Sequence, residues 1–230
     1  MTKVNFLHVG KTGGTALIEA IREFPSSLDL QTHPHGIRLS DIPKGDKVFF
    51  VLRDPTDRFV SGFYSRQRRG LPRYNSPWTK GEEVAFSAFP TANSLAEALS
   101  SKTVERKAAA EHAMEAIDHV RTSFYDWFHN DDYFLSRIND VLFIGMVQHL
   151  NAEFEKLKLL IGMPTEAQLP QDHLRTHRNP SHVDRSLSPV GKANLHMWYK
   201  KDYLFFGLCN RIRVERGLNP IAVGDGPDSP

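Results

Sequence analysis

The sequence predicts an α/β fold with a parallel sheet. Two stretches support this class, because each reads as a strand, a turn and then a helix: residues 4–24 and residues 47–64. Strands that alternate with helices are typical of parallel sheets. We expect residues 1–217 to form a single domain and residues 218–230, rich in Gly, Pro and Asp, to form a flexible tail.

The composition narrows the classes of function. Lys and Arg number 29 against 27 Asp and Glu, a net charge of +2, so no general polyanion binder and no nucleic-acid partner is expected. The single cysteine, Cys209, excludes an internal disulfide framework and a cysteine-based zinc site. The longest purely apolar run, Val48–Leu52, is too short to span a membrane, and the N-terminal apolar stretch is too short for a signal peptide. We therefore expect a soluble, cytoplasmic protein.

The first strand is expected at Val4–Val9. It is followed by a glycine-rich turn and a helix, in which Leu17, Ile21 and Phe24 recur at spacings of four and three residues. Pro25 should end that helix.

The second strand is expected at Lys47–Leu52, a continuous apolar run of the kind buried in a parallel sheet. It leads into a helix for which Asp54 is the expected N-cap and Pro55 the first residue.

The middle of the chain is predicted to be helical, with one further strand. A capping box is expected at Ser94–Glu97, a helical period continues from about Thr103 to Phe128, and Val141–Met146 reads as a strand.

Two helices are expected near the C-terminus. One covers Asn151–Ile161 and ends at Gly162, and the other begins at Ser188 and Pro189. The polar connection between them, residues 163–188, has the length of a binding loop or lid.

The turn after the first strand has the composition of an anion site. In Gly10–Thr15 (GKTGGT) the glycines let the backbone approach a ligand, and the N–H groups that begin the helix point at it. Lys11 adds a positive charge, and Thr12 and Thr15 add hydroxyl donors. A glycine-rich turn that binds nothing is the alternative. A nucleotide triphosphatase loop fits poorly, because Asn5 stands where its first glycine would be.

A second anion site is predicted after the second strand. Arg53 ends that strand, and Ser61 lies seven residues beyond the Asp54 cap, about two helical turns. An extended Arg53 and the Ser61 hydroxyl could therefore bind one anion. Arg58 is more readily explained as an internal partner than as a ligand.

These two motifs together resemble those of the sulfotransferases that use 3′-phosphoadenosine-5′-phosphosulfate (PAPS). The segment from His8 to Thr15 resembles the 5′-phosphosulfate loop, and the segment from Val51 to Tyr64 resembles the 3′-phosphate motif. The resemblance is closest to the branch of the uronosyl 2-O-sulfotransferases and their bacterial relatives.

The resemblance implies a P-loop-like, three-layer α/β fold with a central, mainly parallel sheet flanked by helices. It also implies that adenosine 3′,5′-bisphosphate (PAP), the product of PAPS, spans the two motifs. We expect no metal requirement, because a sulfuryl group carries less charge than a phosphoryl group and the sequence has no conspicuous carboxylate cluster. The residues that the resemblance assigns to the cofactor are Lys11, Thr12, Gly13, Gly14 and Thr15 at the 5′ end, and Arg53 and Ser61 at the 3′-phosphate. Arg178, in the polar connection, is assigned to closure over the 3′-phosphate or the acceptor.

A general base is expected between the two motifs. His33 and His35 resemble the His-x-His element of the uronosyl enzymes, and an imidazole titrates near 6.5, which suits a base at neutral pH. We prefer His35, with His33 second, and Lys11 as the group that stabilises the leaving phosphate. A surface loop and a His-x-His metal pair are the alternatives. His8 is expected to pack beneath the loop.

The acceptor is predicted to be a carbohydrate or glycoconjugate hydroxyl, on a molecule that can carry negative charge. Residues 58–81 hold five Arg and one Lys and no acidic residue, with Tyr74 and Trp78 close by. A solvated basic face explains the same stretch equally well. The rival functions are a P-loop kinase or nucleotide hydrolase, and a non-catalytic module that binds a nucleotide or glycan.

Overall fold

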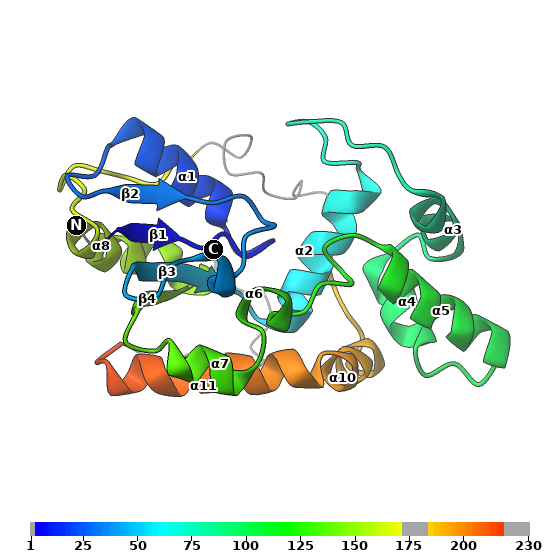
Figure 1. The fold of residues 1–230 in the computed structure, drawn as a ribbon. Coiled ribbons are helices and arrows are strands. Elements are labelled where there is room, and N and C mark those ends of the chain that lie inside the picture. The colour runs from blue at the N-terminus through cyan, green and yellow to red at the C-terminus, as the bar shows by residue number, and fades with distance from the viewer. Residues whose placement is uncertain (1–2, 172–183, 219–230) are drawn as a thin grey trace. The chain divides into compact units, whose positions relative to one another are not determined.

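The structure, a computed structural model, describes residues 3–171 and 184–218 (Figure 1). Its chain divides into two compact units. Of the described residues, the first unit contains 3–53, 124–171 and 205–218, and the second contains 54–123 and 184–204.

The first unit is built on a parallel sheet of four strands in the order β2-β1-β3-β4. The strands are β1 (Val4–Phe6), β2 (Leu30–Thr32), β3 (Lys47–Leu52) and β4 (Val141–Met146). The three-layer α/β fold with a parallel central sheet is thereby confirmed.

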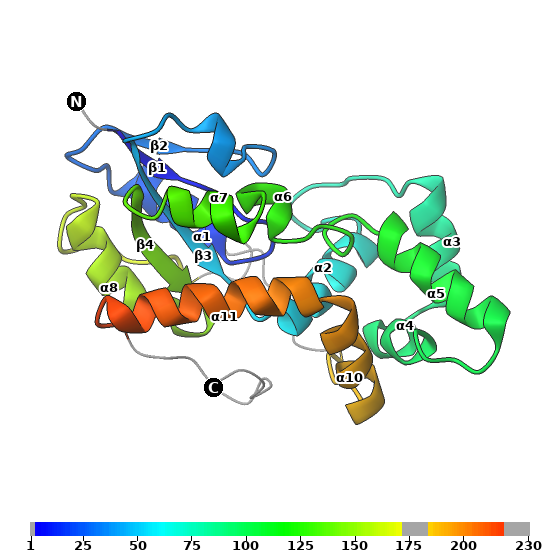
Figure 2. The same cartoon turned by 60° about the horizontal axis from the view of Figure 1, so that its bottom comes forward.

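Helices cover both faces of this sheet. On one face α1 (Gly14–Glu23) and α8 (Leu150–Leu160) pack against Phe6, Phe49 and Val51. The other face is covered by α6 (Tyr125–Phe128), α7 (Asp131–Ser136) and the second part of α11 (Lys200–Glu215). Figure 2 shows α7 and α11 on the same side of the sheet. The short 3₁₀ helices η1 (Leu39–Asp41) and η2 (Val147–His149) complete the unit.

The second unit is helical. It consists of α2 (Pro55–Gln67), α3 (Lys80–Ala88), α4 (Ala92–Ala98), α5 (Val104–Ala116), α10 (Pro189–Trp198) and the start of α11. The helices share an apolar core of their own, in which Phe59, Phe63, Leu95, Met114 and Leu195 are fully or almost fully buried. None of the helices within 3–171 and 184–218 is long and apolar enough to cross a lipid bilayer.

The local sequence signals located several elements correctly. The strands at 47–52 and 141–146 have the predicted bounds, and α10 begins as expected with Ser188 as N-cap and Pro189 as first residue. Asp54 caps α2 by accepting hydrogen bonds from the backbone N–H groups of Thr56 and Asp57 (2.9 and 3.2 Å). The first strand is shorter than predicted and ends at Phe6.

Two predictions about the middle of the chain are wrong. The N-cap of α4 is Thr91, whose side chain accepts from the N–H of Ser94, so Ser94 lies inside the helix instead of capping it. The helix predicted from Thr103 to Phe128 ends at Ala116, and His119 beyond it has a left-handed φ of 64°. Residues 117–124 therefore form an irregular link between α5 and α6.

Candidate functional site

The first unit brings three predicted site segments to one edge of its sheet. His33 and His35 follow β2, the loop with Lys11 follows β1, and Arg53 follows β3. Because these strands are adjacent and parallel, their carboxyl ends lie at the same edge. This edge is where α/β folds bind their ligands.

The loop after β1 has a backbone suited to an anion. Lys11 and Gly13 both have left-handed φ values, 66° and 79°, and alternation of this kind turns successive N–H groups towards one side. A side chain at position 13 is excluded, because a Cβ there would lie 2.9 Å from Val147 Cγ2. Gly13 is also the N-cap of α1, with no side-chain hydrogen bond to the helix and no acidic residue in its first turn. The helix start therefore fits an anionic ligand.

Thr12 has a partner within the loop. Its side chain is buried, and its hydroxyl donates to the Val9 carbonyl oxygen (2.9 Å). This hydrogen bond shapes the loop, and the assignment of Thr12 to the cofactor stays a prediction. Thr15, in the first turn of α1, is half-buried.

Gly14 is a glycine because of His8. A Cβ on Gly14 would lie 2.2 Å from His8 Cδ2 and 3.1 Å from Phe6 Cζ. His8 is 7% exposed and its ring is stacked on that of Phe6, with 5.5 Å between centroids. This position agrees with the expected packing of His8 beneath the loop.

His35 contacts His8 in two ways, by ring packing and by a hydrogen bond to the His8 backbone. The two ring centroids are 3.8 Å apart, and His35 Nδ1 is 3.2 Å from the His8 carbonyl oxygen. Because a carbonyl can only accept, Nδ1 carries the proton in that bond, and in the neutral ring the lone pair is on Nε2. The His35 carbonyl oxygen accepts from Trp127 Nε1 (2.8 Å), which fixes the backbone there.

His33 is directed to a different partner. Its Nε2 lies 2.9 Å from Asn5 Oδ1, while the amide nitrogen of Asn5 donates to the Lys47 carbonyl oxygen (3.2 Å). The Asn5 oxygen is therefore the acceptor, and His33 Nε2 is the donor. Partial burial lowers the pKa of His33 below its usual 6.5. Sequence patterns did not identify Asn5 and Trp127 as partners of the two histidines, because both contacts join residues far apart in the chain.

The second predicted anion motif begins in the first unit and continues in the second. Arg53 is half-buried after β3, and Ser61 is half-buried on α2. Tyr203 of α11 holds the start of α2, because its hydroxyl donates to Asp54 Oδ1 (3.1 Å) and lies 2.8 Å from Thr56 Oγ1. Burial, and the negative charge of Asp54, raise the pKa of Tyr203 well above its usual value. Arg178 lies outside the described residues.

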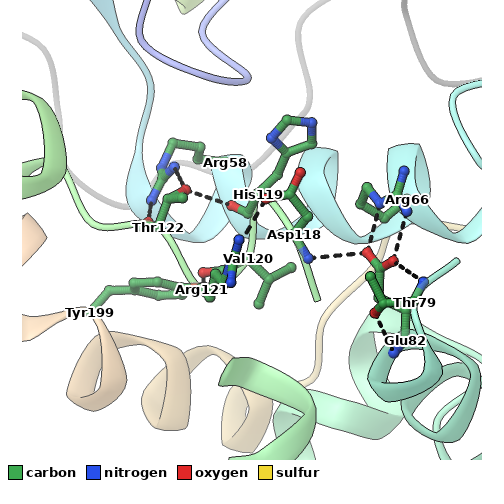
Figure 3. A network of polar contacts seen from close by, with 10 residues as sticks. All are labelled: Arg58, Arg66, Thr79, Glu82, Asp118, His119, Val120, Arg121, Thr122 and Tyr199. Atoms are coloured by element: carbon green, nitrogen blue, oxygen red, sulfur yellow. Dashed lines mark hydrogen bonds and ion pairs between the residues drawn. The ribbon is translucent and has the colours of Figure 1, made fainter. Parts of the chain in front are cut away.

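The basic stretch at residues 58–81 is only partly accessible to a ligand. Arg66 is buried and forms two hydrogen bonds with the Glu82 carboxylate, from Nε to Oε1 (2.6 Å) and from a terminal nitrogen to Oε2 (2.7 Å) (Figure 3). Arg58 is 1% exposed and donates to the hydroxyl and the carbonyl oxygen of Thr122. Arg66 is one of the five arginines of the stretch predicted to suit the acceptor, but it is an internal residue. Arg58 is internal as expected.

Other side chains of that stretch are accessible. Arg69 and Arg73 are exposed, and Tyr74 is 48% exposed. The guanidinium of Arg69 lies 4.5 Å from the centre of the Trp78 ring, whose Nε1 donates to the Arg66 carbonyl oxygen (2.7 Å). Within residues 3–171 and 184–218, no group of three or more His, Cys, Asp and Glu residues could hold a metal ion.

The comparisons with known proteins agree with this fold. A model of the sulfotransferase family matches residues 42–208. Among solved structures, the crystal structure of mouse sulfotransferase SULT7A1 complexed with PAP superposes with a TM-score of 0.51 at 16% identity, over 90% of this chain and 87% of the mouse chain. A search of curated proteins gave no match. Because the family match covers more than half of the chain, the protein belongs to the sulfotransferase family and is a PAPS-dependent sulfotransferase.

Proposed function

We propose that residues 1–217 act as one sulfotransferase domain of the carbohydrate type, with His35 as the general base and a carbohydrate or glycoconjugate hydroxyl as the acceptor. The observation that carries this proposal is the placement of the Lys11 loop, His35 and Arg53 after three adjacent parallel strands. We also infer a cytoplasmic location and catalysis without a metal.

The residues present fit PAPS. We assign its 5′-phosphate to the loop at Gly13, Gly14 and Thr15, where the left-handed φ of Gly13 and the uncapped start of α1 provide an anion site. The 3′-phosphate is assigned to Arg53 and Ser61.

The reaction requires a proton acceptor and a group that stabilises the leaving phosphate. PAPS supplies the sulfuryl group, whose S–O bond to the 5′-phosphate breaks as the acceptor oxygen bonds to sulfur. Lys11 places a positive charge beside the 5′ end, where negative charge grows. His35 Nε2, which holds the lone pair when Nδ1 donates to His8, takes the proton of the acceptor hydroxyl.

His35 is a better base than His33 on the contacts of each ring. The His35 ring packs on His8, which in turn contacts Gly14 at the start of α1. His33 is instead bonded to Asn5, in the middle of β1.

An anionic carbohydrate is the acceptor that suits the accessible part of the basic stretch. Arg69 and Arg73 can bind carboxylate or sulfate groups, while the exposed ring of Tyr74 offers a flat face for a sugar ring.

The test is transfer of radiolabelled sulfate from PAPS across a panel of neutral and anionic sugars, lipids and phenols. The wild type should label anionic sugars, whereas His35→Ala should reduce kcat about a hundredfold or more while PAP affinity stays within about twofold. Lys11→Ala should reduce kcat by about 10²–10³-fold.

Two controls make the result specific. His112→Ala, an exposed histidine on α5, should leave the rate unchanged. Unchanged transfer by the His33→Ala/His35→Ala double variant would refute the base assignment. PAP binding without transfer to any acceptor would favour a non-catalytic module.

A further inference from the structure

Three groups in contact, His35, His8 and Gly14, connect the proposed base to the loop at Gly10–Thr15, which is called the anion loop below. The ring of His35 lies against that of His8, with 3.8 Å between centroids and 44° between planes. The His8 ring also lies close to Gly14, where a Cβ would lie 2.2 Å from His8 Cδ2 and 2.3 Å from Nε2. One imidazole therefore separates His35 from the start of α1.

The His8 ring has little freedom to move. It is 7% exposed, and it is stacked on the ring of Phe6 with 24° between planes. Phe6 is itself fully buried against Phe49 of the neighbouring strand, with 5.0 Å between centroids. The position of the His8 ring is thus set by the core of the sheet.

The backbone of His8 also orients the proposed base. Its carbonyl oxygen accepts from His35 Nδ1, which directs the lone pair of the neutral ring to Nε2. Trp127 Nε1 donates to the His35 carbonyl oxygen and so holds the His35 backbone. The His8 ring packs against the His35 ring at a tilt of 44°.

We propose that His8 is a positioning residue for sulfuryl transfer: its imidazole sets the distance between the His35 ring and the anion loop at Gly14. This inference rests on the proposed function, in which His35 is the base and the loop binds the 5′-phosphate. A base displaced by about 1 Å can lose about a hundredfold in rate, so the spacing matters for kcat.

The first test separates positioning from binding. His8→Ala should lower kcat by about tenfold to a hundredfold, with KM for PAPS and Kd for PAP within about twofold of the wild type. His8→Gln, which keeps a flat polar end group near the position of Nε2, should recover most of the lost kcat. His8→Leu, of similar bulk but without a flat face, should not.

Two outcomes would overturn the positioning role. One is an unchanged kcat in His8→Ala. The other is a loss of kcat matched by an equal loss of PAP affinity, which would make His8 a support of the loop alone. His112→Ala is the matched histidine control.

The second test measures PAP binding and does not depend on sulfate transfer. Gly14→Ala should weaken PAP binding in calorimetry at least tenfold, because its Cβ collides with a ring that cannot move aside. Adding His8→Ala to that variant should restore Kd to within about threefold of the wild type, since the ring is gone. A double variant that binds as weakly as Gly14→Ala would refute the contact on which the inference depends.

If the proposed function itself is wrong, the results for PAP binding and sulfate transfer differ from those expected when only the positioning role is wrong. A wild-type protein that neither binds PAP nor transfers sulfate refutes the proposed function and the positioning role together. A wild type that does both, beside an unaffected His8→Ala variant, refutes the positioning role alone.

Discussion

At the scale of single residues, three arginines that are close in the sequence have different environments. Arg53 is half-buried at the end of β3, whereas Arg58 and Arg66 are buried in the helical unit and engaged by Thr122 and Glu82. A buried guanidinium is stable only where partners accept its hydrogen bonds. The burial of Arg58 and Arg66 therefore depends on their partners in the helical unit.

Glu82 provides the first test at this scale. Its carboxylate is fully buried and also accepts from the backbone N–H groups of Thr79 (2.9 Å) and Asp118 (3.2 Å). We expect Glu82→Gln to lower the free energy of unfolding by about 3–5 kcal/mol, because it leaves the Arg66 charge buried without a counter-charge. Urea unfolding at pH 7 would measure this. Glu111→Gln, at an exposed pair with Lys107, should change it by less than about 1 kcal/mol.

The same carboxylate predicts a pH dependence. Burial alone would raise the pKa of Glu82, but the hydrogen bonds from Arg66, Thr79 and Asp118 outweigh it and hold the pKa below its usual 4.5. A lowered folded-state pKa stabilises the fold above pH 4.5, and this contribution is lost as the pH falls through the folded-state value. The difference between wild type and Glu82→Gln should therefore shrink from pH 7 to pH 3. Parallel losses in the two proteins would contradict the assignment.

At the scale of elements, one side of α2 explains why the helix predicted to reach Phe128 stops early. Arg58, Gly62 and Arg66 follow each other at intervals of four residues and so share one side of the helix. Arg58 donates to Thr122, and Arg66 is joined through Glu82 to the backbone of Asp118 (Figure 3). Between them, Gly62 lies against His119. These contacts hold residues 118–122 as an irregular segment.

The same substitution, glycine to alanine, at two helical positions tests that explanation. Gly207→Ala in α11 should raise the free energy of unfolding by about 0.5–1 kcal/mol, because the new methyl group would meet nothing closer than 3.9 Å. Gly62→Ala should show no such gain, because its Cβ would lie 3.2 Å from His119 Cβ and 3.3 Å from the His119 carbonyl carbon. Urea denaturation of both variants decides this, and an equal gain at both sites would exclude a close contact at Gly62.

At the scale of the whole molecule, each compact unit is assembled from segments that are distant in sequence. The parallel sheet pairs β4 with β3, nearly a hundred residues earlier, and the helical unit joins α10 to α2 and α4. The chain passes from the first unit to the second directly after Arg53, within the second anion motif.

Binding of the product nucleotide should therefore be visible in global stability. PAP at about 100 times its Kd should add about 2.7 kcal/mol to the free energy of unfolding, or about 5–10 °C in Tm for a chain of this length. Adenosine 5′-monophosphate, which lacks the 3′-phosphate, should shift Tm less, and Arg53→Ala should abolish that difference. A larger shift with ATP and Mg²⁺ than with PAP would favour the kinase or hydrolase alternative.

The sequence by itself determined the parts that depend on local chemistry. The continuous apolar runs at 47–52 and 141–146 can only be buried, and Asp54 with Pro55 satisfies the first N–H groups of α2 without help from distant residues. The loop after β1 follows from a local signal of the same kind, because glycines directly after a strand predict a turn wherever the strand packs.

Only the tertiary structure decided the remaining features, because each depends on a partner distant in the chain. β2 has three residues and no apolar pattern, and it exists through its pairing with β1, which also brings His33 and His35 beside the anion loop. The end of α5 depends on Gly62, and the burial of Arg66 depends on Glu82. Long-range contacts of this kind produce neither a hydrophobic periodicity nor a capping signal, so local sequence patterns do not predict them.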